Sequence, residues 1–181
     1  MATFGHAALG LVAARVLHPE DRFPPLSSLA FWSALSVVPD VDLIGYALGV
    51  PYGDSWGHRG ATHSIAFAVV TALVVGAWAW RREAGFATAF VTALLVVGSH
   101  PVLDSLTDGG LGPAFLWPFS AERFFASWNP LSAAPFGTHF FAQSGVRVLL
   151  VEALEFAPVF AFALWPRETQ AEATEDADAA G

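Results

Sequence analysis

A stretch of nine residues, WGHRGATHS from Trp56 to Ser64, concentrates the side chains best suited to chemistry. It holds His58, Arg59 and His63, and an apolar run without any charge follows over residues 65–80. Imidazole is the side chain used most often as a metal ligand and as a proton carrier near neutral pH. Two surface histidines in a polar loop are the alternative interpretation of this stretch alone. Its position directly before the start of an apolar helix favours a site at a membrane surface.

Two further motifs place aspartate or histidine at short spacing. Asp40 and Asp42 lie two residues apart after Pro39, a spacing found both in cation sites and in helix-capping turns, and both interpretations stay open. His100 and Asp104 lie four residues apart, so on a helix they share one face. Because ionisable groups near a membrane interior are costly and usually functional, we interpret His100 and Asp104 as a ligand pair.

The composition indicates an integral membrane protein. Of 181 residues, 55% are hydrophobic and 13% are charged, and the mean hydropathy is +0.52. Soluble domains carry about 25% charged residues. This chain has about half that share, which is too little to cover a water-facing surface. The chain has no cysteine, so a metal ion must be bound by histidine and carboxylate. It also has no basic patch, which argues against nucleic acid as a partner.

The hydrophobic pattern predicts an all-α integral membrane bundle of about five apolar helical segments. Residues 43–57 are expected to be a connecting loop, and residues 108–144, rich in Gly, Pro and aromatic residues, an irregular lid with short helices. We expect Thr62 to cap the third helix and Pro101 to kink the fourth. The five segments are residues 2–17, 26–38, 61–80, 84–106 and 145–165.

The chain is expected to form one domain with a tail. Residues 1–167 are predicted to be a single membrane-embedded helical domain. Residues 168–181 contain five acidic residues, no basic residue and no apolar run, which predicts a disordered acidic tail.

The arginine distribution predicts the orientation in the cytoplasmic (inner) membrane. Basic residues are enriched on the cytoplasmic side, which places Arg81 and Arg82 inside. If each helix crosses the membrane, the tail is then inside as well, and the candidate site faces the extracytoplasmic side of a multi-pass protein. The residues that gather on that side are His6, Asp40, Asp42, His58, His63, His100 and Asp104.

Taken together, these motifs resemble the YdjM family of inner-membrane proteins. The resemblance is carried by His6, PDVD at 39–42, HRGATHS at 58–64 and HPVLD at 100–104. WPFS at 117–120 with Arg123, and Arg147 with Glu152, are similar to the later segments of the family. The resemblance implies a membrane-bound, metal-dependent hydrolase.

Roles follow for the candidate residues. Asp42 or Asp104 is a candidate general base. Arg59 and Arg123 could hold an anionic substrate through forked hydrogen bonds, although Arg123 could equally be an interfacial anchor. We also assign Arg147 and Glu152 to the substrate site, with mutual pairing as the alternative. The predicted metal-binding residues are His6, Asp40, Asp42, His58, His63, His100 and Asp104.

This ligand set exceeds what one tetrahedral zinc ion needs. It could hold two divalent ions, or one ion with further carboxylates that orient the imidazoles. Zinc is the first expectation, with manganese and iron as alternatives. A divalent ion polarises an ester or phosphoryl oxygen. Because the site is expected at the bilayer surface, we expect the substrate to be a lipid or lipid-linked phosphoester, with amides and other esters open. The bilayer is the expected partner, and the sequence sets no oligomeric state.

Two other classes of protein use similar features. A divalent-cation binder or transporter could use the same ligands, but transporters usually place them near the bilayer midplane, whereas these lie at helix ends. An interaction protein could recruit a partner through the acidic tail. The position of the ligands favours the hydrolase.

Overall fold

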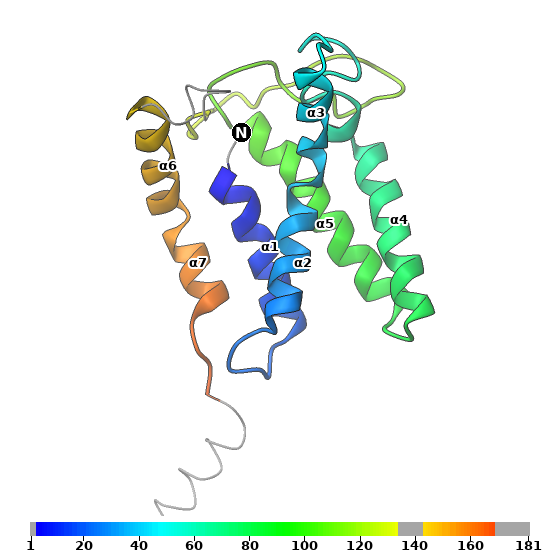
Figure 1. Cartoon of the computed structure of the whole chain (residues 1–181), viewed down its shortest axis with the longest axis vertical. Helices are drawn as coiled ribbons and strands as arrows, with labels where there is room; N and C mark the ends of the chain where they lie inside the picture. The colour runs from blue at the N-terminus through cyan, green and yellow to red at the C-terminus, as the bar shows by residue number, and fades with distance from the viewer. Residues whose placement is uncertain (1–2, 134–142, 169–181) are drawn as a thin grey trace, which may run out of the picture.

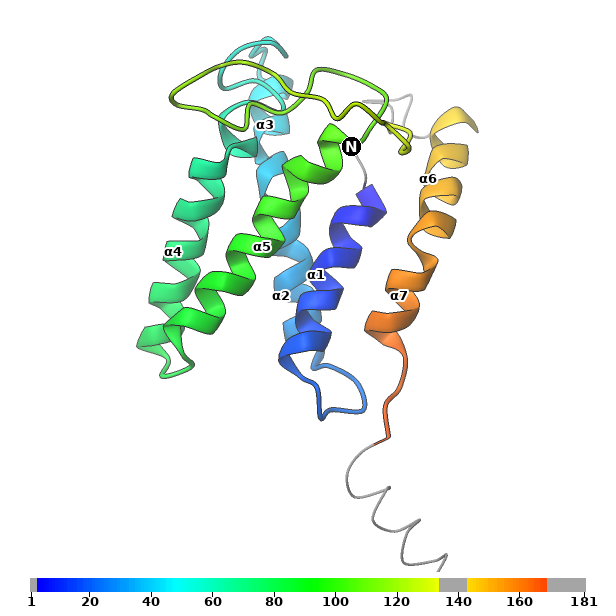
Figure 2. The ribbon, with the colours of Figure 1, turned by 180° about the vertical axis from the view of Figure 1, so that it is seen from behind.

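The protein is described by a computed structural model in which residues 3–133 and 143–168 are placed. The described residues form a helical bundle, with two long loop regions gathered at one end of it (Figures 1 and 2). The chain runs up and down between the two ends, so α1, α4 and α6–α7 leave the loop end while α2 and α5 approach it (Figure 1). The helices are α1 (Thr3–Leu17), α2 (Leu26–Ser36), η1 (Val38–Val41), α3 (Asp42–Ala47), η2 (Ala61–His63), α4 (Ile65–Arg81), α5 (Phe86–Ser105), α6 (Gln143–Glu155) and α7 (Ala157–Leu164).

The core lies between α1, α2, α4 and α5 and consists largely of small residues. Ala14, Ala72 and Ala93 are fully buried, and Trp32 fills the space beside them. Gly10 of α1 has no room for a side chain, because a Cβ there would collide with the carbonyl oxygen of Trp32. Small residues allow helix backbones to approach closely, which is the usual mode of packing in membranes.

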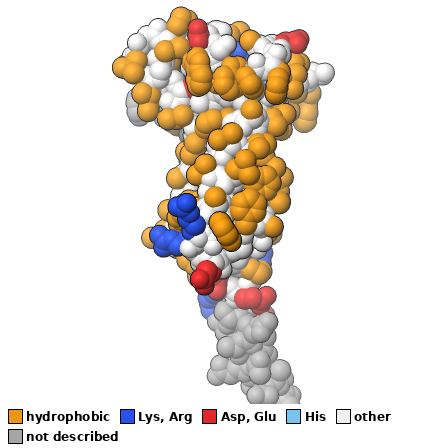
Figure 3. Space-filling model, turned by 90° about the vertical axis from the view of Figure 1, so that its right-hand side faces the viewer, with side chains coloured by type: hydrophobic (Ala, Val, Ile, Leu, Met, Phe, Trp, Pro, Cys, Tyr) orange, Lys and Arg blue, Asp and Glu red, His pale blue; other side chains and the backbone are white. Residues whose placement is uncertain are grey.

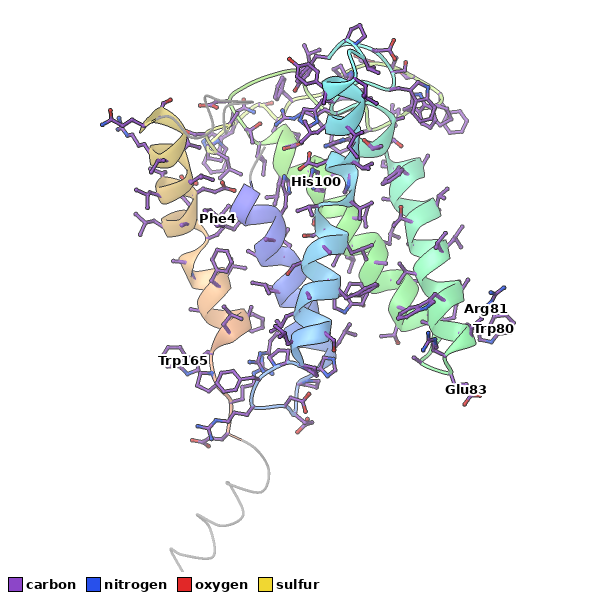
Figure 4. All side chains as sticks on the ribbon, viewed as in Figure 1. Phe4, Trp80, Arg81, Glu83, His100 and Trp165 are labelled. Carbon is purple, nitrogen blue, oxygen red and sulfur yellow. The ribbon has the colours of Figure 1, made fainter. Side chains whose placement is uncertain are left out.

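The outer surface is apolar, as expected of a membrane protein. Helix α5 is long and apolar enough to cross a membrane, and α2 with the following residues 38–47 passes the same test as a pair bent by 59°. Helices α1 and α4 are apolar but shorter. Figure 3 shows hydrophobic side chains over the side of the bundle, with basic and acidic side chains near the end far from the loops. Figure 4 labels Arg81 and Glu83 at that end and His100 nearer the loops.

The all-helical prediction is confirmed, but two boundaries in the first half were wrong. Residues 43–47, expected to be loop, belong to α3, which begins at Asp42 and continues from the 3-10 turn η1. Pro39 occupies the first turn of η1, where a missing N–H is tolerated, so it starts a helical turn as well as ending α2. Thr62 does not cap α4. The cap is Ser64, whose Oγ accepts the N–H of Phe67 at 3.0 Å, while the Thr62 hydroxyl donates to Asp42.

In the second half, the expected fifth helix is broken in two. It divides at Phe156 into α6 and α7, because Pro158 in the first turn of α7 has no N–H with which to continue the helix before it. Helix α5, by contrast, continues through Pro101 to Ser105. Residues 106–133 contain no helix, so the short helices expected in the lid are absent from its described part. The rest of the lid at 134–142 and the acidic tail at 169–181 lie outside the described residues.

A buried arginine fastens the end of the bundle opposite the loops. The Arg15 guanidinium donates to the carbonyl oxygens of Ala163 at 3.0 Å, Trp165 at 2.9 Å and Asp21 at 2.9 Å. These contacts satisfy carbonyls at the end of α7, which have no partner within the helix. They hold α7 against α1 at the end of the bundle opposite the candidate site.

Candidate metal centre

Four side chains from three parts of the chain converge beneath the loops, and we call them the four-residue cluster: Asp40, His63, His100 and Asp104. His63 Nε2 lies 3.3 Å from Asp104 Oδ2 and 3.6 Å from Asp40 Oδ1. His100 Nε2 lies 3.4 Å from Asp40 Oδ1 and 3.8 Å from Asp104 Oδ2. A tetrahedral zinc ion with bonds of about 2.0–2.2 Å would separate its ligands by about 3.3–3.6 Å, so the spacing fits such an ion.

The cluster also contains polar atoms that require a partner. Asp40 Oδ1, His63 Nε2 and His100 Nε2 are buried, and among the described residues none of them has a hydrogen-bond partner. A buried polar group without a partner destabilises a protein by about 1–3 kcal/mol. Their convergence on one point is what a bound cation would explain, so the residues fit a metal ion.

Neighbouring groups turn both imidazoles toward the cluster. His100 Nδ1 donates to the carbonyl oxygen of Ser36 at 2.8 Å, and His63 Nδ1 lies 3.0 Å from Asp42 Oδ2. Each contact leaves Nε2 as the nitrogen available to an ion, a pattern common to metal-binding histidines. The Ser36 carbonyl is at the end of α2, where helix carbonyls lack internal partners. Sequence reasoning missed Ser36, although the helix end before Pro39 was a usable signal.

Asp42 accepts hydrogen bonds from the surrounding motif. Its Oδ1 lies 2.7 Å from His58 Nδ1. Its Oδ2 accepts the Thr62 hydroxyl at 2.6 Å and the Arg59 N–H at 3.1 Å, and it contacts His63 as described above. Asp42, His58 and His63 also form a second group whose ligand atoms lie close enough to hold an ion. Asp42 therefore positions both histidines of the HRGATHS motif.

Arg59 is buried beside the cluster in a constrained conformation. Its φ of +63° is in the left-handed region, which non-glycine residues adopt rarely and often at functional sites. Its Nη2 donates to Asp104 Oδ1 and to the Thr107 hydroxyl, both at 3.0 Å, and its Nη1 donates to the carbonyl oxygens of Gly109 and Leu111. Arg59 thus fixes Asp104 and ties the second loop region to the first. Thr107 was not identified from the sequence.

The site has a net negative charge that a cation would balance. Asp40, Asp42 and Asp104 carry three negative charges and Arg59 one positive charge, so two negative charges remain when the histidines are neutral. Burial opposes a charge on His63, but the nearby carboxylates of Asp104, Asp40 and Asp42 outweigh it and raise the pKa of His63 to about 10. In the metal-free protein a proton on His63 offsets part of the negative charge that a divalent ion would balance in full.

His6 joins the site from α1. Its ring stacks on that of His100, with centroids 3.5 Å apart and planes 9° apart. Its Nε2 lies 3.5 Å from Asp104 Oδ1, on the side of the carboxylate that Arg59 holds. The structure thus brings all seven predicted metal-binding residues into one buried network.

The other predicted site residues belong to neither group of potential metal ligands. The Arg123 guanidinium donates to the carbonyl oxygens of Asp54 at 2.8 Å and His58 at 3.3 Å, so it braces the two loop regions. Glu152 is buried, and its Oε1 accepts the N–H of Gly5 at the start of α1. Arg147 is exposed on α6. Substrate binding by these three residues and by Arg59 stays a prediction.

Comparison with known proteins covers nearly the whole chain. The family model described as YdjM inner membrane protein matches residues 1–169, a range that includes every residue of the site. Inner membrane protein YbcI of Escherichia coli (strain K12) is 40% identical over 121 residues, which are 65% of this chain and 69% of the relative. No solved structure matches the chain.

Proposed function

The chain belongs to the YdjM family of inner membrane proteins, as its motifs predicted, and we propose that it is a membrane-bound, metal-dependent hydrolase. The observation that carries this proposal is the four-residue cluster, where two imidazole nitrogens and two carboxylate oxygens converge at ligand spacing beneath the loops. Two histidines and two carboxylates at tetrahedral spacing favour zinc, with manganese and iron as alternatives.

The protein residues divide into an ion-holding group and a proton-handling group. When bound, a divalent ion supplies Lewis acidity, which polarises an ester or phosphoryl oxygen and makes water more acidic. Both oxygens of Asp42 already accept hydrogen bonds, and Asp104 is shared between Arg59 and the cluster. Asp42 and Asp104 stay the proposed candidates for the general base, because the His58 nitrogen nearest the cluster is Nδ1, which is already engaged with Asp42 at 2.7 Å and lies 3.9 Å from Asp40. Arg59 acts as a positioning residue for Asp104.

The depth of the cluster favours a lipid substrate. Helix α5 has 20 residues and is about 30 Å long, close to the thickness of the hydrocarbon core of a bilayer. His100 and Asp104 lie in its last two turns, within roughly 10 Å of the loop end. This is the level at which the hydrocarbon layer meets the phosphate and ester groups of lipids. A lipid or lipid-linked phosphoester is therefore the proposed substrate class.

We place the site on the extracytoplasmic side. Arg81 lies at the end of the bundle away from the loops, and the positive-inside rule assigns that end to the cytoplasm (Figure 4). A fluorescent protein fused after Arg167 is expected to fluoresce, and alkaline phosphatase inserted beside the exposed Phe119 to be active. The reverse pattern would turn the site toward the cytoplasm and contradict the orientation.

The hydrolase proposal is tested with the purified protein in detergent. It is expected to hydrolyse an amphiphilic phosphoester, to stop when chelator removes the ion, and to resume when zinc is restored. A panel of esters and amides identifies the bond. The matched control is His18→Ala, which removes a half-exposed histidine outside the cluster and should leave the rate unchanged. A protein that hydrolyses nothing in the panel but moves divalent ions into proteoliposomes would be a transporter instead.

A further inference from the structure

An apolar groove runs along the outside of α4 and α5, which pack side by side (Figure 2). Its volume is 460 Å³, within the usual range for small-ligand sites. Phe115 of the second loop region covers its upper end, where the Phe115 carbonyl oxygen accepts the N–H of Ile65 at 3.0 Å. It is lined by Ile65, Ala68, Leu94, Leu95, Pro101 and Val102, together with Gly98 and with Ser99, whose hydroxyl donates to the carbonyl oxygen of Val96.

Gly98 is the feature that helix packing does not explain. A glycine within a helix costs about 1 kcal/mol relative to alanine. Gly10 has a packing reason, because a Cβ there would meet the α2 backbone. A Cβ at Gly98 would meet no atom within 4 Å. Glycine at this position keeps the groove open rather than allowing two helices of this chain to approach.

The surroundings of Gly98 favour an acyl chain over a second copy of the protein. Close pairing of membrane helices uses small residues four positions apart, but Gly98 is flanked at that spacing by Leu94 and Val102. Leu95 is 67% exposed and Val102 50% exposed, so their side chains form rims that hold another backbone away. In an inner membrane protein, lipid covers an apolar outer surface of this kind.

The groove ends close in the chain to the cluster. Pro101 at its upper end directly follows His100, and Ile65 is two residues after His63. Both histidines belong to the four-residue cluster. We propose that this groove is the acyl-chain site of the substrate lipid, so that a chain seated against Gly98 brings the lipid linkage to the level of the cluster. The inference rests on the proposed hydrolase for its purpose, but binding can be measured without catalysis.

The test is photolabelling of the full chain in liposomes of phosphatidylethanolamine and phosphatidylglycerol. The probe is phosphatidylglycerol with a diazirine on its acyl chain, and the labelled peptides are mapped by mass spectrometry. Labelling of residues 94–102 should saturate with increasing probe and be competed by unlabelled lipid. Gly98→Leu places four carbon atoms in the groove and should reduce this labelling about tenfold, because a change of one methylene in an apolar pocket already alters recognition by about tenfold or more.

Control variants keep the result interpretable. Ala87→Leu introduces the same side chain at an exposed position on α5 away from the groove and should label like the native chain. Leu95→Trp, at an exposed rim position, is a second filling variant that should behave like Gly98→Leu. Bound metal should be equal in all of them, which shows that the fold is kept.

The outcomes separate the groove from the hydrolase. Labelling that rises in proportion to probe and ignores both filling variants would mean ordinary surrounding lipid and would overturn the acyl site. Crosslinks between two chains at the groove would overturn it in favour of a second copy. Saturable labelling without hydrolysis would keep the acyl site and reject the hydrolase. If both hold, Gly98→Leu should slow a long-chain substrate about tenfold and leave a short-chain analogue unaffected.

Discussion

Replacing His63 and His100 together by alanine is expected to abolish both the bound ion and turnover. The double variant removes the two nitrogens of the four-residue cluster and leaves Asp40 and Asp104 as the remaining ligands. Loss of groups that merely orient ligands already costs about 10–100-fold in metal affinity or activity, so loss of two ligands should exceed that range. Metal content of purified protein, measured by mass spectrometry after dialysis, should fall from one or two equivalents to none.

The single variants and a control define the result. His63→Ala should lower the metal content more than His58→Ala does, because His63 belongs to both groups able to hold an ion. His18→Ala should retain the native metal content. Equal metal in the native protein and in the double variant would contradict a metal centre at these residues.

Asp42→Asn is expected to weaken metal binding and slow turnover, each by about 10–100-fold. The native carboxylate oxygens face donors from His58, Thr62, His63 and the Arg59 backbone. An asparagine has only one acceptor oxygen, and its amide nitrogen cannot accept from any of these groups. One histidine therefore loses its orientation, while the four ligand atoms of the cluster all remain.

A chelator-competition titration and steady-state rates measure the two effects of Asp42→Asn. Complete loss of metal would make Asp42 a ligand. Unchanged metal affinity with lost turnover would make it the general base. Asp54→Asn changes an exposed aspartate in the same loop region and should alter neither quantity, which controls for the loss of a charge.

Much of the fold followed from the sequence. An apolar run such as residues 86–105 predicts a membrane helix without further information. In lipid the backbone N–H and C=O groups must bond within the segment, and a helix achieves this. Because successive apolar runs cross the bundle in opposite directions, their order also predicted that the candidate site residues lie at one end and Arg81 at the other. The split of the last helix at Phe156 and the helix at 42–47 did not follow from the sequence, because a proline such as Pro158 or Pro39 is compatible both with the end of one helix and with the first turn of the next.

For the site, residue types and their spacing predicted which side chains meet at one end of the bundle. It could not determine their roles, because spacing along a chain does not say which atom of a side chain faces which neighbour. Only the tertiary structure put His63 Nε2 beside Asp40 and Asp104 and its Nδ1 beside Asp42. It also engaged Arg123 with backbone carbonyls and left Arg147 exposed, although both resembled substrate-binding residues. These contacts join residues far apart in the chain, so their geometry is set by helix packing rather than by any local pattern.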